Sequence, residues 1–382
     1  MRIYAQADEE KVRAQAAVRE WQRSGFLDTS QAAQIANELR VDFRRTNFFL
    51  RALLFLFTSI VVAASVSLVI TVFGLDEKTS EATVCVIAAI LCLGAAEFLI
   101  KNFRFYRFGV EEALAIAAVV LLSLATAFVT SGFEVGELVA PLAIGALGTL
   151  FIYMRYGYLY AAIASILCAA AIPFPMHVPA EGKRLIAALV SAFLFSIVRR
   201  ARLQLGKDFR EDDFGLIQAS AWAGLYLSLN LQISFVRYYE PSLFYWVTYA
   251  MIWIVPVAGL WLSVRSKDRP LLNVSLLAAL ITLATNKPYL HLMRRPWDPI
   301  LFGLFLIFSA VLIKRWLGGG PPNAERRGFT AARLLARDRQ ALAIVSTASD
   351  ALQPGMSPSL APPAKPNFDG GRSGGAGATG SF

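Results

Sequence analysis

The glycine-rich end of the chain carries the spacing that most resembles a chemical motif. Gly375, Gly377 and Gly380 fit the G-x-G-x-x-G pattern with which dinucleotide-binding proteins hold a pyrophosphate. Such a site requires a strand before the first glycine and a helix after the last, because backbone amides at the helix N-terminus bind the phosphates. Residues 361–374 are too rich in proline and glycine to form a buried strand, and only Ser381 and Phe382 follow. We therefore predict neither a nucleotide nor any other cofactor.

Acidic residues near the ends of two apolar segments are the first candidates for chemistry. Glu97 is followed one helical turn later by Lys101, and Glu111 and Glu112 begin the next apolar segment. Because ionisable groups in hydrocarbon are costly, they are functional candidates by default, here for binding a cation or relaying protons. The alternative is structural: Glu97 pairs with Lys101, and the other two carboxylates favour the positive end of a helix while staying hydrated.

Two asparagines lie within apolar segments further along the chain. Asn230 follows Tyr226 by one helical turn in the most polar of these segments, and Asn273 lies in a later one. Such side chains either form hydrogen bonds between helices or line a pathway for a solute. The sequence leaves both interpretations open for both asparagines.

The loop 285–299 is the most distinctive connection between apolar segments. It contains His291, Arg294, Arg295 and Trp297. The two arginines are candidates for binding an anionic lipid headgroup or solute, with the histidine as a pH-sensitive neighbour. Alternatively, they contact lipid phosphate non-specifically beside an ordinary tryptophan anchor.

The usual signatures of enzymes are missing. The two histidines, His177 and His291, lie in separate loops, so a histidine-rich metal site is not expected. The chain contains no H-E-x-x-H motif and no phosphate-binding P-loop, nor a G-x-S-x-G elbow in a strand-turn-helix context. Cys85, Cys92 and Cys168 fall within apolar segments and are interpreted as small buried hydrophobic residues. We predict no enzymatic activity, no metal and no catalytic residue.

Composition shows what kind of scaffold must position the candidates. Hydrophobic residues make up 56% of the chain and charged residues 17%, and the mean hydropathy is +0.53. These values predict an all-α, polytopic bundle of about ten transmembrane helices within residues 48–316. The ten apolar segments are Leu53–Val72, Ala82–Ile100, Ala113–Val129, Leu138–Tyr153, Tyr158–Phe174, Leu185–Val198, Gly215–Ser234, Leu243–Val264, Leu271–Thr285 and Ile300–Ile313.

The charges of the loops predict an orientation. With ten spans and a cytoplasmic N-terminus, Lys and Arg are more frequent in the inside loops than in the outside loops. If Leu185–Val198 is not counted as a span, the outside loops contain more of these residues instead. We therefore expect a multi-pass protein of the bacterial inner membrane with both termini cytoplasmic, although charges closely bracket Leu185–Val198. The net charge of +10 fits basic faces attracted to the lipid bilayer, without nucleic acid as a partner.

Residues 1–47 form a separate polar module, predicted to be a cytosolic helical hairpin with a capping box at Asp28. The stretch WQRSGFLDTSQAAQI resembles the hairpin that opens a family of uncharacterised bacterial multi-spanning membrane proteins, a domain of unknown function. The resemblance implies a many-helix inner-membrane protein and no catalytic residues. It rests on Trp21, Gly25, Leu27, Gln31, Ala32 and Ile35.

Residues 317–382 form a cytosolic tail, in which Thr330–Val345 predicts a short amphipathic helix and the remainder is expected to be disordered. The last residues resemble the GG-x-SGGGGASG-aromatic ends of several bacterial membrane proteins. Gly370, Gly371, Ser373, Gly374, Gly375, Gly377, Gly380 and Phe382 fit that pattern, whereas Ala376 replaces a glycine.

Two functions follow from these observations. The number of helices and the polar segment around Asn230 favour solute transport. The alternative is a non-catalytic scaffold or sensor that binds a protein partner through the N-terminal hairpin or the Gly-rich tail.

Overall fold

The computed structural model describes residues 3–23, 27–75, 77–132, 138–205, 213–233, 242–266 and 268–290, several residues between 300 and 315, and two short segments near the C-terminus. The chain divides into two compact units. One comprises Met1–Gln6 with Val41–Leu292, and the other Ala7–Arg40 with Met293–Phe382. Each unit is described by itself.

The second unit contains a helical hairpin, α1 (Gln6–Arg23) and α2 (Thr29–Glu38). The backbone N–H of Asp28 donates to Gln31 Oε1 at 3.1 Å, which fixes the start of α2, and Gln15 Nε2 donates to the Leu39 carbonyl oxygen at 2.7 Å. Trp21, near the end of α1, has 49% of its surface exposed.

Two strands are described in the tail, for which the sequence predicted disorder. β1 (Ser373–Gly375) and β2 (Ala378–Gly380) pair antiparallel, with Ser373 opposite Gly380. The amphipathic helix predicted at Thr330–Val345 lies outside the described residues.

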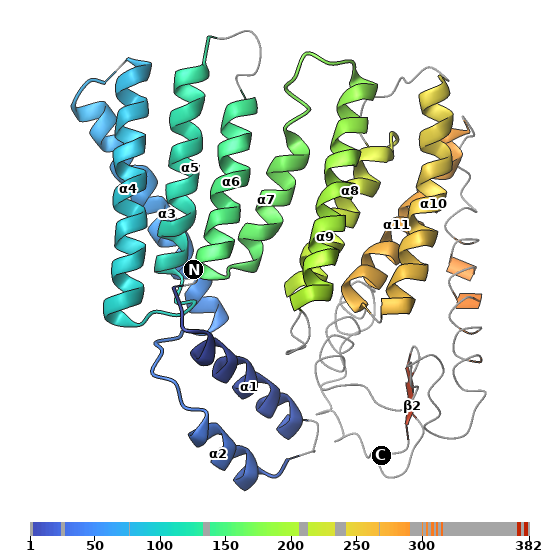
Figure 1. Ribbon diagram of the computed structural model, residues 1–382, viewed down its shortest axis with the longest axis horizontal. Coiled ribbons are helices and arrows are strands. Elements are labelled where there is room, and N and C mark those ends of the chain that lie inside the picture. The colour runs from blue at the N-terminus through green and yellow to red at the C-terminus, as the bar shows by residue number, and fades with distance from the viewer. Residues whose placement is uncertain are drawn as a thin grey trace, which may run out of the picture. The chain divides into compact units, whose positions relative to one another are not determined.

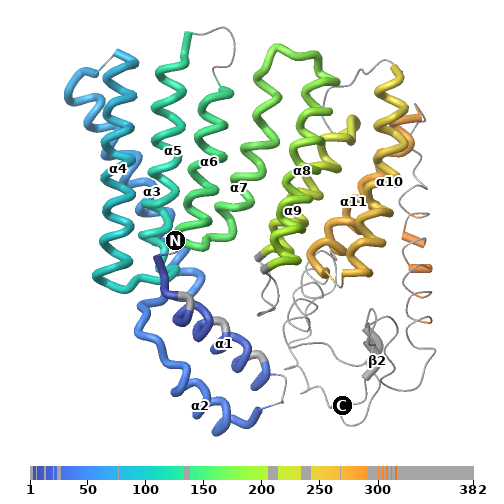
Figure 2. The backbone as a smooth tube through the Cα atoms, in the orientation of Figure 1, coloured from blue at the N-terminus to red at the C-terminus, as the bar shows by residue number. Residues whose placement is uncertain are grey.

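The first unit is a bundle of helices that run alternately up and down, as Figures 1 and 2 show. In the first half of the bundle, α5 packs on α3, α4 and α6. In the second half, α7 packs on α8 and α9, and α9 also contacts α10 and α11. The helices are α3 (Phe48–Val72), α4 (Lys78–Phe103), α5 (Val110–Thr130), α6 (Val139–Tyr156), α7 (Leu159–Ala171), α8 (Ala180–Leu205), α9 (Asp213–Leu229), α10 (Leu243–Ser266) and α11 (Arg269–Tyr289).

Six described helices are long and apolar enough to cross a membrane: α3, α4, α5, α6, α10 and α11. The prediction of a helical protein with several membrane-capable segments is thus confirmed, whereas ten spans are not. With 13 and 17 residues, α7 and α9 reach only about 20 and 25 Å along their axes. α8 has 26 residues, but lysine and arginine bracket its apolar middle. Most of Ile300–Ile313 lies outside the described residues.

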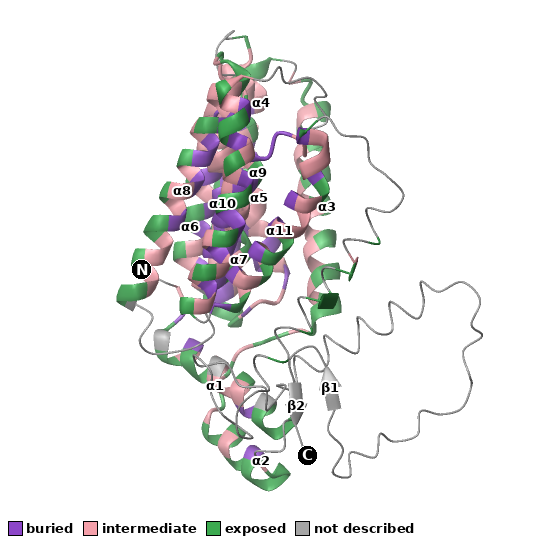
Figure 3. Cartoon of the chain, turned by 90° about the vertical axis from the view of Figure 1, so that its right-hand side faces the viewer, coloured by how far each residue is buried: buried purple, intermediate pink, exposed green. Residues whose placement is uncertain are grey.

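Buried side chains collect along the middle of the bundle (Figure 3). One apolar cluster joins α7 to α11 around Trp222, Tyr226 and Ile252, and a smaller one joins α4 and α5 around Cys85 and Ala118. α3 contains no buried residue. Among the described residues, the two halves of the bundle thus have separate apolar clusters.

Candidate functional site

An arginine and a glutamate tie the start of α3 to the start of α5. Arg51 Nε donates to Glu112 Oε2 at 2.7 Å, and a second, very short bond joins Arg51 Nη2 to Glu112 Oε1. The Glu112 side chain is only 2% exposed. This two-bond geometry is the strongest arrangement for an arginine and a carboxylate. It replaces the water that Glu112 loses on burial, so this residue is not hydrated at a helix end as the structural interpretation assumed.

Gly109 allows α3 and α5 to approach this closely. It caps the N-terminus of α5 with a φ of 112°, a conformation that side chains strongly disfavour. A Cβ atom at this position would lie 2.4 Å from the Arg51 backbone oxygen. The glycine therefore permits the contact that brings Arg51 to Glu112.

Glu111 is the neighbouring carboxylate, and it has a different environment. The residue is fully buried, and its Oε1 accepts a hydrogen bond from the Phe108 backbone N–H at 2.7 Å. Its Oε2 is buried with no hydrogen-bond partner among the described residues. Both hydrogen bonds that join Arg51 to a carboxylate within the described residues go to Glu112, the neighbour of Glu111 in the sequence. Glu111 Oε2 is thus a buried acidic oxygen that no described group binds.

Two buried tyrosines are influenced by the charges of the two carboxylates. Tyr4, near the N-terminus, is 5% exposed and donates its hydroxyl to the Phe105 backbone oxygen at 3.1 Å. Tyr158, between α6 and α7, is buried as well, with 1% of its surface exposed. Burial is the main cause that raises the pKa of both phenols above the usual value, and the nearby Glu111 and Glu112 raise it further. Both hydroxyls therefore keep their protons. We call Tyr4, Arg51, Glu111, Glu112 and Tyr158 the Glu111 cluster.

The segments before and after the N-terminal hairpin form hydrogen bonds with the end of α6 and with the loop that precedes Glu111. The Ile3 backbone N–H donates to the Arg155 oxygen at 2.9 Å. On the other side of the hairpin, the Arg44 N–H donates to Arg104 at 3.1 Å, and Thr46 Oγ1 donates to the Phe108 oxygen at 3.1 Å. Both segments that flank the hairpin thus contact the helix ends around the Glu111 cluster.

Glu97 does not share the contacts of Glu111 and Glu112. It accepts from Lys101 Nζ at 3.0 Å and from Arg155 at 2.8 and 3.1 Å, and its side chain is 28% exposed. The expected pair with Lys101 is present, and Arg155 of α6 is an additional partner. Glu97 is therefore held in an ion-pair network that joins α4 to α6.

A second polar network lies between α9, α10 and α11. Asn230 is fully buried, and its Nδ2 donates to the Tyr226 hydroxyl at 3.0 Å and to Thr285 Oγ1 at 3.1 Å. The Tyr226 hydroxyl lies 2.8 Å from Thr282 Oγ1. Asn230 Oδ1 accepts from the Gln232 backbone N–H at 3.2 Å. All polar atoms of the asparagine side chain are thus satisfied by protein groups, as a residue joining helices requires.

The network ends at a carbonyl group of α10 that Pro256 leaves without a backbone donor. Pro256 lies inside α10 and lacks the N–H that would reach the Ile252 carbonyl one turn earlier. Thr282 Oγ1 of α11 donates to that carbonyl oxygen at 2.8 Å. The network therefore runs from the end of α9 to a carbonyl that the proline leaves unpaired.

A second buried ion pair lies at the ends of α8 and α11. Arg202 contacts Asp268 through a very short bond, and the Asp268 side chain is fully buried. Asp268 also caps α11 by accepting from the Leu271 N–H, and Arg202 lies 3.4 Å from Gln218 Oε1 of α9. Sequence reasoning missed this pair. An aspartate two residues before Pro270 is the sequence signal that marks such a cap.

The remaining predicted residues lie elsewhere. Asn273 is exposed on the surface of α11, in contrast to Asn230. Arg294 and Arg295 lie outside the described residues. Among the residues that the structure describes, no group of three or more His, Cys, Asp and Glu side chains could hold a metal ion.

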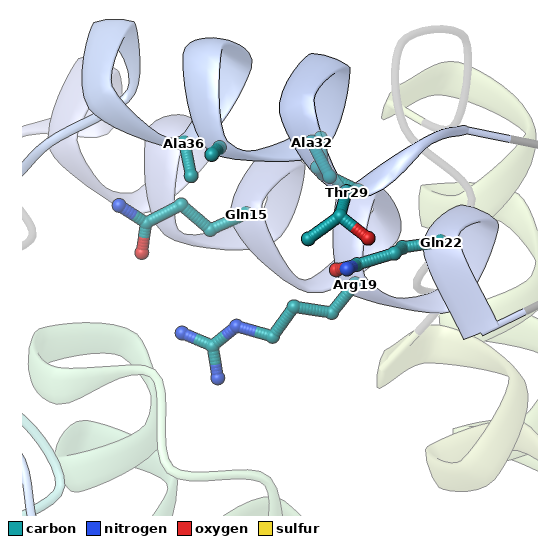
Figure 4. A pocket seen from close by; sticks show the side chains of 8 residues that line it. Gln15, Arg19, Gln22, Thr29, Ala32 and Ala36 are labelled. Carbon is teal, nitrogen blue, oxygen red and sulfur yellow. The ribbon is translucent and has the colours of Figure 1, made fainter.

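A groove between the two hairpin helices is the remaining candidate (Figure 4). It has a volume of about 260 Å³ and is lined by Gln15, Val18, Arg19, Gln22, Thr29, Ala32, Ala33 and Ala36. Small residues of α2 form one wall, and longer polar side chains of α1 form the other. The groove is mixed in character, with amides and one guanidinium at its edges.

No protein-family profile, curated protein or solved structure matches the chain. The chemistry of the site therefore rests on its own geometry. The Arg202 pair and the Asn230 network are closed arrangements suited to joining helices. The Glu111 cluster differs because it holds a buried carboxylate oxygen, Glu111 Oε2, that has no hydrogen-bond partner among the described residues.

Proposed function

We propose that this chain is a multi-pass protein of the bacterial inner membrane, with both termini in the cytoplasm, that moves a small solute across the bilayer. The observation that carries the proposal is Glu111, a fully buried carboxylate in the first turn of the membrane-capable helix α5. A pair that only joins helices needs one carboxylate for its arginine, and Glu112 already fills that role. Because a buried ionisable group beyond this need is costly, it favours a role in moving charge or solute.

Interrupted helices add support. Transport proteins build their central sites from broken membrane helices, whose ends and exposed backbone groups bind solutes and ions. Here α7 has only 13 residues, and Pro256 interrupts the hydrogen bonding of α10. These features fit a bundle whose halves change their packing.

Uptake into proteoliposomes tests the proposal. The purified chain is reconstituted and exposed to a panel of radiolabelled small solutes, with empty liposomes as the blank. We expect uptake of at least one solute by the wild type and its loss in Glu111→Gln. Glu77→Gln is the matched control, because Glu77 is an exposed carboxylate at the start of α4. Equal uptake by the Glu111 and Glu77 variants would contradict the role of Glu111, and no uptake of any solute would count against transport.

The hairpin groove favours a second candidate function, that of a scaffold or sensor. Its amide-lined edges and the half-exposed Trp21 are typical of a surface that binds a protein segment. In that case deletion of residues 7–40 removes a specific partner and leaves solute flux unchanged. Reduced flux without loss of a partner would favour transport with a regulatory hairpin.

A further inference from the structure

A groove opens on the surface of the bundle where α4, α5 and α6 lie side by side (Figure 1). Its volume is about 580 Å³, and it is lined by five residues of α4, five of α5 and two of α6. Because α5 packs against both of its neighbours, its residues form the middle of the groove. The lining residues belong to the beginning of α4 and α6 and to the end of α5, so the groove lies at one end of the bundle.

The groove extends along the helices for about the thickness of one lipid leaflet. Its lining residues in α4 run from Thr79, next to the helix start, to Ile87. Eight residues of α-helix span about 12 Å. All three helices are long and apolar enough to cross a membrane, and half of the hydrocarbon core is about 15 Å thick. In a bilayer, the groove therefore reaches from the membrane boundary to near the midplane.

The threonines in the groove use their hydroxyl groups within their own helices. Thr83 Oγ1 donates to the Thr79 carbonyl oxygen at 2.7 Å. Thr126 Oγ1 donates to the Ser123 oxygen at 2.8 Å, and Thr130 Oγ1 donates to the Thr126 oxygen at 2.7 Å. These bonds satisfy the hydroxyl hydrogens without a ligand, so the threonines contribute methyl groups to a mainly apolar lining. The chemistry of the groove thus suits a hydrocarbon chain.

Hydrocarbon is also what surrounds the groove in a bilayer. Water is absent at this depth, and a groove left empty would lose the dispersion contacts of its lining atoms. Such packing holds apolar surfaces together inside membranes. An acyl chain in the groove can contact three helices at once, whereas a chain on α3, which contains no buried residue, meets the surface of one helix.

Lys78 lies at the end of the groove. It directly precedes the lining residue Thr79, and Ser131 directly follows the lining residue Thr130. Lys78 Nζ donates to the Ser131 carbonyl oxygen at 3.3 Å, which holds the ammonium group between α4 and α5. The lysine is exposed, and an ammonium group has three N–H donors, so it can bind a phosphate in addition to this carbonyl.

The two carboxylates near this lysine lie on another face of α4. Glu77, Glu81 and Cys85 follow one another at intervals of about one helical turn and therefore share a face. Cys85 is buried in the apolar cluster of α4 and α5, whereas Thr83 is exposed and lines the groove. The charge at the end of the groove is thus positive and complements a lipid phosphate.

We propose that this groove is a binding site for one phospholipid, whose acyl chain lies between α4, α5 and α6 and whose phosphate contacts Lys78. The lipid fills the surface where three helices meet and stabilises their packing. The inference goes beyond the proposed transport function and does not depend on it, because the lining residues are distinct from the Glu111 cluster.

Photo-crosslinking of the full-length protein in lipid nanodiscs tests the site. The probe is a phosphatidylglycerol with a diazirine in its acyl chain, and mass spectrometry locates the labelled residues. We expect the groove residues of α4 and α5 to be labelled about tenfold more than α3, which is the internal control for an apolar surface without a groove. Equal labelling of α3 and the groove would overturn the proposal.

Filling the groove tests where the chain lies. Thr83→Trp occupies the groove and is expected to lower the labelling of α4 and α5 about tenfold. Thr71→Trp is the matched control, because Thr71 is an exposed threonine of α3 whose hydroxyl likewise donates to a carbonyl of its own helix, at 2.8 Å. Val86→Trp repeats the test at another exposed groove position should the first variant fail to fold. Unchanged labelling in the groove variants, or an equal loss in Thr71→Trp, would refute the site.

A diacylglycerol with the same photoreactive chain tests the phosphate contact. We expect the wild type to be labelled about threefold less by this lipid than by phosphatidylglycerol, since the ion pair is exposed. Lys78→Gln should be labelled equally by both lipids. Lys101→Gln, at the opposite end of α4, should keep the wild-type preference. A preference that survives in Lys78→Gln would contradict the proposed role of this lysine.

A second copy of the chain is the competing occupant. Mass photometry of the nanodiscs measures how many chains each contains. We expect the same number for the wild type and for Thr83→Trp. A wild-type dimer that becomes monomeric in Thr83→Trp, but not in Thr71→Trp, would show that protein fills the groove and would overturn the lipid site.

Discussion

The hydroxyl of Thr282 lies 2.8 Å from the carbonyl oxygen of Ile252, the acceptor that Pro256 leaves without a backbone donor. The same hydroxyl contacts Tyr226, which in turn contacts Asn230. A defect in the backbone of α10 is thus compensated by a side chain of α11, and the compensation extends to α9. This arrangement explains why so polar a network lies between apolar helices.

Thr282→Val is expected to lower the free energy of unfolding in detergent by about 2 kcal/mol, because it leaves the Ile252 carbonyl buried without a donor. In a Pro256→Ala background the new N–H supplies that carbonyl, so the same threonine substitution is expected to cost about 1 kcal/mol less. Chemical denaturation of the four proteins in this cycle measures the difference.

Thr149→Val is the matched control for this cycle. Thr149 is also a buried threonine, but its hydroxyl bonds only to carbonyls of its own helix. We expect its cost to be the same with and without Pro256. Equal coupling of Thr149 and Thr282 to the proline would contradict the proposed compensation.

Removing one partner of the Arg51–Glu112 pair is expected to be costly. Glu112→Gln leaves a guanidinium without its buried anion, and we expect a loss of about 3 kcal/mol of unfolding free energy. The double variant Arg51→Met with Glu112→Met should cost less than the sum of the two single variants, since neither charge is left alone. Glu97→Gln, in a partly exposed network, should cost about 1 kcal/mol. Thermal unfolding of the variants gives the comparison, and additive losses in the double variant would contradict a coupled pair.

Gly109→Ala tests the close approach of α3 to α5. The substitution combines a disfavoured φ with a collision against the Arg51 backbone, so we expect a loss of about 3 kcal/mol. Gly132→Ala is a close control, because Gly132 has a φ of 117° and nothing within 4 Å of a new Cβ. Its cost should be only about 1 kcal/mol, from backbone strain alone. A similar loss in both variants would show that the contact with Arg51 has no energetic weight.

Asp268 has two roles that substitutions can separate. Asp268→Asn keeps a side-chain oxygen for capping α11 but removes the charge that faces Arg202, and we expect it to cost about 3 kcal/mol. Asp268→Ala also removes the cap and should cost about 1 kcal/mol more. Unfolding free energies and the helical content of both variants report the two effects. An alanine variant no less stable than the asparagine variant would argue against the capping role.

The sequence predicted the long apolar helices well, because about 20 uncharged residues in a row are a strong local signal. It assigned α7 and α9 as spans, since composition alone does not show where a helix stops. The face shared by Tyr226 and Asn230 was visible from helical periodicity. Thr282, the hydrogen-bond partner of Tyr226, was not visible, because it lies 56 residues further along the chain.

The Glu111 cluster was predicted only in part. The position of Glu111 and Glu112 at the start of an apolar segment marked them as candidates. Their environment depends on distant parts of the chain, namely Arg51 of α3, which pairs with Glu112, and Tyr4, which binds the preceding loop at Phe105. A single tyrosine near a terminus has no periodicity, so pattern analysis has no signal for it. Side-chain burial at a helix end is a tertiary property that local sequence does not encode.

Orientation in the membrane is the last prediction. In a variant whose native cysteines are replaced by alanine, single cysteines are placed at three exposed positions: Glu77 before α4, Asp42 between α2 and α3, and Leu203 near the end of α8. The excess of Lys and Arg in the inside loops predicts that a membrane-impermeant maleimide labels position 77 in intact spheroplasts. Positions 42 and 203 should be labelled only after the membrane is permeabilised. Labelling of position 203 from outside, with position 42 still protected, would show that the second half of the bundle has the opposite orientation and that only one of α7 and α8 crosses the membrane.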